Sequence, residues 1–242
     1  MAAVGGGMWL MWLGLAMAEP ADVLVVVTPG LETTMWSEWT DRLTPKHRVE
    51  LFVPSCTATS AEAVVDDLVM RAEALDQPVV LAHGLGATVS LMAGARLHAR
   101  RMVLLAPVLA SPNHLLLQES LVAWQGLEAK NLSSSEDRHL AWMGSESPAP
   151  GCFAEGVRED LVAWMSEGTV PLVFDQVATP LWVGGALLDE WSPPEVLVPT
   201  ARAHGFSVYR LGRHNFAPHD VGHGSMIGDR WVRRRVLREV RR

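Results

Sequence analysis

A short stretch near residue 84 has the residue types of a sharp strand-to-helix corner. Residues 79–82 form an apolar run, a turn of small residues follows, and a helix-like pattern resumes at Leu91. Such a corner requires small residues two positions before and two positions after its apex, and Ala82 and Gly86 supply them. The apex of this corner is Gly84, which has no side chain and therefore no atom that could attack a substrate.

The sequence around this corner resembles the nucleophile elbow of the α/β-hydrolase superfamily, which includes esterases and lipases. In that family the elbow reads small-x-Ser-x-Gly, and a histidine often precedes the serine. His83, Leu85 and Gly86 match this form, whereas Gly84 occupies the position of the serine. Because glycine has no side chain, acyl-enzyme chemistry at residue 84 is impossible. Glycine also relieves the backbone strain of an elbow, so it stabilises a corner whose nucleophile is no longer under selection.

The resemblance also implies positions for the other catalytic groups. Asp189 stands a few residues after the apolar run 181–185, where the family carries its acid, and His223 lies in a Gly-His-Gly turn that matches the family's histidine loop. The backbone N–H groups of Leu31 and Leu85 would form the oxyanion hole. The order of elbow, acid and histidine along the chain is the order of the family.

These assignments leave three functional hypotheses. The first is a catalytically degenerate α/β-hydrolase-fold protein that binds a small apolar or acyl ligand, or a partner. The second is an active hydrolase of carboxylic esters or related acyl bonds, in which His223 and Asp189 activate water. A relocated hydroxyl nucleophile (Thr88, Ser90 or Ser225) is a variant of the second. The third is an interaction module without a ligand pocket, in which replacing Asp189 or His223 changes only stability.

The elements that must position these groups follow from short apolar runs that alternate with amphipathic segments. We expect strands at 21–27, 48–53, 79–83, 102–107, 180–185 and 207–211. We expect helices at 33–43, after Ser60, after the corner, at 196–204 and at the C-terminus. This alternation predicts an α/β fold with a mainly parallel sheet and helices on both faces.

Residues 109–178 interrupt the alternation. They carry little strand signal, and three amphipathic pieces lie at 115–127, 137–143 and 157–165. In the resembling family a helical cap is inserted at this point, over the site. Trp124, Trp142 and Trp164 could line an apolar pocket there, or they could bury the cap helices against the sheet.

Composition restricts the partners and cofactors. The net charge of −7 argues weakly against nucleic acid, and the sequence has no zinc-type Cys/His spacing and implies no metal or cofactor. Cys56 and Cys152 could form one disulfide or remain separate thiols. The C-terminal helix has an apolar stripe and seven arginines, which form either a solvated face or a basic patch for a weak contact with anionic lipid at a membrane surface or with a polyanion.

The N-terminal residues 1–18 have the apolar core and the Ala-x-Ala end of an export signal, although no basic residue precedes the core. We therefore expect a protein exported to the periplasm or secreted, with one α/β-hydrolase domain over 19–242; without export the location would be cytoplasmic.

Overall fold

The computed structural model describes residues 22–27, 36–55, 57–109, 174–187, 194–213 and 225–242, with shorter pieces at 189, 192, 216–217, 221–222 and five positions between 157 and 164. The elements are, in chain order, β1 (Val23–Val26), α1 (Ser37–Leu43), β2 (Val49–Phe52), α2 (Ala61–Glu73), β3 (Val79–His83), α3 (Gly84–Met92), β4 (Arg101–Leu105), β5 (Leu181–Ala186), α8 (Pro194–Ala203), β6 (Ser207–Arg213), β7 (Phe216–Ala217), α9 (Ser225–Gly228) and α10 (Arg230–Val240).

One parallel sheet organises these elements. Its seven strands lie in the order β2-β1-β3-β4-β5-β6-β7, and every neighbouring pair is parallel. The predicted fold class, with its mainly parallel central sheet, is therefore confirmed. The short strand β7 has no signal in the sequence, because two residues are too few to show a hydrophobic period.

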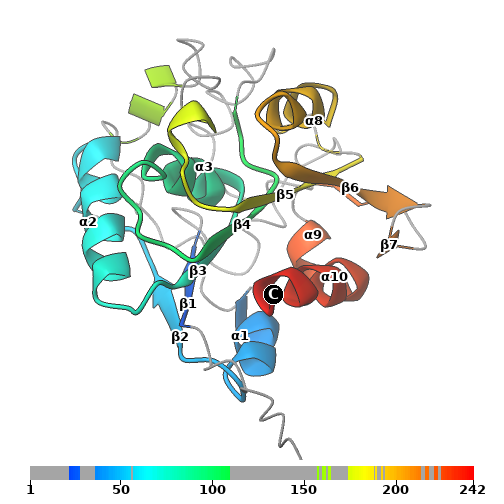
Figure 1. Ribbon diagram of the computed structural model, residues 1–242, viewed down its shortest axis with the longest axis horizontal. Helices are drawn as coiled ribbons and strands as arrows, with labels where there is room; N and C mark the ends of the chain where they lie inside the picture. The colour runs from blue at the N-terminus through cyan, green and yellow to red at the C-terminus, as the bar shows by residue number, and fades with distance from the viewer. Residues whose placement is uncertain are drawn as a thin grey trace, which may run out of the picture.

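Helices cover both faces of the sheet. In Figure 1, α1, α9 and α10 lie together on one side, and α2, α3 and α8 lie on the other. On the first side, the indole Nε1 of Trp39 in α1 donates a hydrogen bond of 2.9 Å to the carbonyl of Ile227 in α9. This contact joins segments that are 188 residues apart in the sequence.

The central strands are apolar along almost their whole length because both of their faces are covered. All residues of β1, β3 and β5 are buried, and so are four of the five in β4. Gly184 in β5 marks a close approach, because a Cβ there would lie 2.8 Å from the ring of Trp182 and 3.0 Å from Leu211.

Polar side chains define the helix ends. The hydroxyl of Ser60 accepts a 3.1 Å hydrogen bond from the backbone N–H of Ala63, as its predicted capping role requires. The carboxylate of Asp160, which is 99 residues further along the chain, accepts a 2.8 Å hydrogen bond from the backbone N–H of Ala61. Asp229 caps α10 in the same manner, by accepting from the N–H groups of its second and third residues.

A buried carboxylate fixes the end of α10 against the sheet. Glu239 is fully buried and lies 3.1 Å from the guanidinium of Arg101, at the start of β4. It also pairs with Arg235, and with Arg242 at 3.2 Å. Three cations on one buried carboxylate couple the C-terminal helix to the middle of the sheet.

Several sequence predictions fall outside the described residues: the signal segment 1–18, Cys56, Cys152 and most of the expected cap, including Trp124 and Trp142. Trp164 is described; it is partly buried and packs against the main core. Within the described part of the chain, no helix is both long enough and apolar enough to cross a bilayer.

Candidate active site

The corner between β3 and α3 is as tight as the sequence predicts. His83 is the last residue of β3, and Gly84 is the first residue of α3, so no loop separates strand and helix. Gly84 has φ of +55°, which is the left-handed region that L-residues avoid. The backbone at the apex thus has the strained form of an elbow, and glycine adopts it without the steric penalty of a Cβ.

The residue after the apex is placed to supply a backbone donor. Leu85 lies in the first turn of α3, where N–H groups have no acceptor within the helix and the helix dipole favours negative charge. Its side chain is buried, so the backbone of this turn is held firmly. The oxyanion-hole role of Leu85 stays a prediction, and Leu31, the other predicted donor, lies outside the described residues.

The two hydroxyls on the elbow helix are engaged elsewhere. Thr88 is fully buried; its Oγ1 accepts from the N–H of Val108 at 3.0 Å and lies 2.9 Å from the carbonyl of the same residue. It also lies 3.3 Å from the carbonyl of Gly84. Ser90 is buried and donates to the carbonyl of Gly86 at 2.8 Å. Neither hydroxyl is free to replace the nucleophile.

The predicted acid lies in a buried turn after β5. Asp189 is 4% exposed, and its Oδ1 accepts a 2.7 Å hydrogen bond from the backbone N–H of Ser192. The hydroxyl of Ser192 in turn donates a 2.6 Å bond to the carbonyl of Pro107, just beyond β4. The carboxylate is thus held by a turn that is itself fastened to the neighbouring strand.

These contacts connect the acid with the elbow. Asp189 binds Ser192, Ser192 binds Pro107, and the next residue, Val108, binds Thr88 beside the carbonyl of Gly84. The network spans the carboxyl ends of β3, β4 and β5, which are adjacent in the sheet (Figure 1). Ligands of open parallel sheets bind at this edge.

A strained alanine lies at the carboxyl end of β4. Leu105 pairs with His83 across the β3–β4 ladder, and Ala106 follows Leu105 as Gly84 follows His83. Ala106 has φ of +44°, a left-handed conformation that is uncommon for a residue with a Cβ. Its N–H donates a 2.7 Å bond to the carbonyl of Gly184 in β5, which holds this conformation. Strain of this kind concentrates at functional sites.

The flanks of the histidine loop are packed, although His223 itself lies outside the described residues. Val221 and Gly222 are buried before it, and the N–H of Met226 donates to the carbonyl of Gly222 at 3.2 Å after it. Ser225 begins α9, but its side chain is not described. The structure therefore leaves the assignment of His223 as a prediction.

Sequence reasoning missed the residues that hold the site together: Ser192, Pro107, Ala106 and Val108. A serine three positions after an aspartate is a signal for a local turn. No pattern in the sequence signals the contact of Ser192 with a carbonyl 85 residues away. Among the residues that the structure describes, no group of three or more His, Cys, Asp or Glu side chains could hold a metal ion.

No protein-family model matches the chain, and no curated protein sequence matches it. Solved structures match most of its length. An N-formylmaleamic acid deformylase from Pseudomonas putida is 17% identical, with a TM-score of 0.66 and 92% of both chains covered. A hydrolase from Oleispira antarctica is 14% identical, with a TM-score of 0.68 and 91% of both chains covered. A thermophilic esterase from Thermogutta terrifontis is 17% identical, with a TM-score of 0.60 over 91% of this chain and 90% of the other.

These neighbours share an architecture with this chain at identities that establish the fold alone. The parallel strand order, the loop-free β3–α3 corner and the acid after β5 lead to the same result. The chain has the α/β-hydrolase fold.

Proposed function

We propose that this chain is an α/β-hydrolase-fold protein without a serine nucleophile, and that it binds a small apolar or acyl ligand at the elbow. The observation that carries the proposal is Gly84 at the apex with φ of +55°. The corner keeps the backbone shape that serves a nucleophile, yet the residue in that place has no atom with which to attack.

The surroundings of Gly84 support binding better than acyl transfer. The N–H of Leu85 at the start of α3 can donate a hydrogen bond to a carbonyl or carboxylate oxygen of an acyl group. The hydroxyls of Thr88 and Ser90 are committed to backbone carbonyls, so they cannot form an acyl-enzyme. The tryptophans of the predicted cap, Trp124, Trp142 and Trp164, are candidates to contact the apolar remainder of the ligand.

One observation favours a second candidate function, the hydrolysis of esters by activated water. Asp189 is buried and held by the N–H of Ser192, as an acid that orients a histidine must be. In this mechanism His223 takes a proton from water, the resulting hydroxide attacks the ester carbonyl, and the oxyanion is stabilised by the N–H of Leu85. The carbon–oxygen bond to the alcohol then breaks, and His223 returns the proton to the leaving alkoxide. Water would then attack the ester directly, in the role that the serine has in α/β-hydrolases with a serine nucleophile.

Four proteins separate the two functions: the parent, Gly84→Ser, Gly84→Ala and His223→Ala. Each is assayed with p-nitrophenyl esters of short and medium chain length and is incubated with a fluorophosphonate, which labels activated serines. Gly84→Ala is the matched control for Gly84→Ser, because both variants add a Cβ at the apex and only one adds an oxygen. Under the degenerate reading, only Gly84→Ser hydrolyses the esters and gains the mass of the label.

Ester hydrolysis by the parent that disappears in His223→Ala would refute the degenerate reading and establish water activation. For the binding itself, octanoate should raise the melting temperature of the parent in a concentration-dependent manner, because a ligand of the native state stabilises it. Acetate carries the same charge without the apolar chain and is the control. Equal responses to octanoate and acetate would contradict an apolar binding site.

A further inference from the structure

The C-terminal helix and α1 enclose an open hollow that the elbow chemistry does not use. Its volume is about 690 Å³, and it lies on the side of the sheet covered by α1, α9 and α10 (Figure 1). Five exposed arginines line it together with the partly buried Trp231; we call this the arginine hollow. The arginines are Arg42, Arg230, Arg234, Arg238 and Arg241.

The cations of the arginine hollow are not neutralised by acidic neighbours. Arg233, which also lines it, pairs with Glu38, and the three arginines around Glu239 share that buried carboxylate. Among the residues that the structure describes, none of the five has a carboxylate within ion-pair distance. The whole chain has a net charge of −7, so this local cluster of positive charge is opposite in sign to the chain as a whole. Like charges gathered in this way repel one another, and a bound anion would relieve the repulsion.

Three of the five guanidiniums, those of Arg230, Arg234 and Arg241, contact neighbouring groups. The guanidinium carbons of Arg230 and Arg234 lie 5.3 and 5.7 Å from the ring centroid of Trp231, within cation–π range. Arg241 donates a 3.3 Å hydrogen bond to the carbonyl of Arg42, which brings the two sides of the hollow together. Side chains ordered before binding lose less entropy when they bind a ligand.

The apolar side of α10 is unavailable to a membrane. Val232, Val236, Leu237 and Val240 are all buried against the protein. The large apolar side chains that are exposed among the described residues are Leu51, Val53 and Met70, and none of them belongs to α1 or α10. A helix that lies in a bilayer surface inserts an apolar face, and α10 has none left to insert. A concave surface lined mainly by arginines fits a discrete soluble anion better than a flat bilayer.

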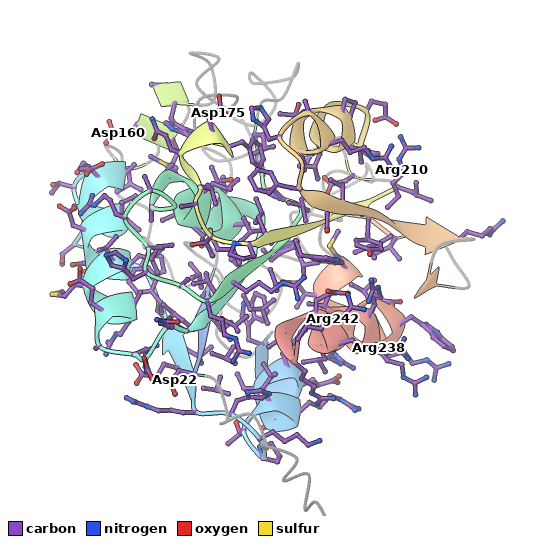
Figure 2. All side chains as sticks on the ribbon, in the orientation of Figure 1. Asp22, Asp160, Asp175, Arg210, Arg238 and Arg242 are labelled. Atoms are coloured by element: carbon purple, nitrogen blue, oxygen red, sulfur yellow. The ribbon has the colours of Figure 1, made fainter. Side chains whose placement is uncertain are left out.

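We propose that the arginine hollow binds a soluble polyanion that carries two or more phosphate groups. Arginine presents a planar fork of donors that matches phosphate oxygens, and several guanidiniums around one hollow can engage adjacent phosphates of one ligand. The site involves none of the residues assigned to the elbow, so it stands independently of the proposed function. Figure 2 labels Arg238 on α10 and Arg210 on β6.

Calorimetric titration with sodium tripolyphosphate at low ionic strength tests the proposal. The test variant combines Arg234→Gln with Arg238→Gln, and the matched control combines Arg202→Gln with Arg210→Gln. The control pair is exposed, lies on α8 and β6, and removes the same charge. Because two charge-assisted contacts are lost, the test variant should bind at least about tenfold more weakly than the parent. The control should bind as the parent does, and added salt should weaken binding by the parent.

Three results would overturn the proposal. The first is no binding of tripolyphosphate to a parent protein that is folded by circular dichroism. The second is an equal loss of affinity in the test and control variants, which would mean general charge attraction without a site. The third is a parent protein that binds vesicles of phosphatidylcholine and phosphatidylglycerol but does not bind tripolyphosphate, with vesicle binding lost in the test variant and retained in the control variant. That result would identify the arginine hollow as a membrane contact.

Discussion

The backbone at the elbow makes a quantitative prediction for Gly84→Ala. Gly84 has φ of +55°, where a Cβ approaches the neighbouring carbonyl oxygen at a cost of about 1–2 kcal/mol. Alanine also reduces the entropy of the unfolded chain, which returns about 0.4–1 kcal/mol. The net expectation is a loss of about 1 kcal/mol in the free energy of unfolding. For a chain of this size that lowers the melting temperature by about 2–4 °C.

Gly205 provides the matched control for the backbone term. It follows α8 with φ of +75°, and a Cβ built on it meets nothing within 4 Å. Its N–H donates to the carbonyl of Arg202 at 3.0 Å, as in a helix that ends on a left-handed glycine. Gly205→Ala therefore measures the penalty of the left-handed backbone without any steric contact from neighbouring side chains.

Urea unfolding of the parent, Gly84→Ala and Gly205→Ala separates the contributions. Similar losses in the two variants would mean that backbone conformation alone accounts for the glycine at the apex. A distinctly larger loss of unfolding free energy in Gly84→Ala would indicate that the added Cβ also meets a steric contact at the elbow. If Gly84→Ala were as stable as the parent while Gly205→Ala lost about 1 kcal/mol, the elbow would not be left-handed in solution. The reasoning from φ would then be refuted.

Three further substitutions test the contacts that support the site. Ser192→Ala leaves the buried carbonyl of Pro107 without its 2.6 Å donor and should lower the free energy of unfolding by about 1–3 kcal/mol in urea; no change would mean that water replaces the hydroxyl. Glu239→Gln keeps the shape but removes the buried charge shared by three arginines, so urea unfolding should show a loss of about 3–5 kcal/mol, and a loss below about 1 kcal/mol would contradict the coupling. Gly184→Ala places a Cβ 2.8 Å from Trp182 and should cost about 1–3 kcal/mol by thermal unfolding; a stabilised variant would show that the ring moves freely.

The sheet could be predicted from the sequence because its signal is local. Each central strand is a short apolar run, and its burial on both faces follows from that composition. The corner at Gly84 could be predicted for a similar reason, since small residues at fixed offsets determine how tightly a strand can turn into a helix. The capping role of Ser60 likewise depends on residues within one helical turn.

The contacts that hold the site could not be predicted, because they join distant segments. The hydroxyl of Ser192 meets a carbonyl 85 residues away, and the carboxylate of Asp160 meets an N–H 99 residues away. Neither residue type is unusual in a loop or a helix, so neither stands out in the sequence. The left-handed conformation of Ala106 could not be predicted either, because an alanine in the sequence does not indicate a positive φ.

The two left-handed residues at the carboxyl edge of the sheet bear on the proposed loss of the nucleophile. Gly84 follows the last residue of β3 and Ala106 follows the last residue of β4, with φ of +55° and +44°. A strained alanine persists only where its surroundings determine its conformation, and the bond from its N–H to the carbonyl of Gly184 does so here. Glycine adopts the left-handed backbone at the apex without strain, whereas Ala106 keeps its strain. The proposed function requires that the framework around the apex be assembled while the attacking oxygen is missing. Restoring the oxygen in Gly84→Ser therefore tests that framework directly.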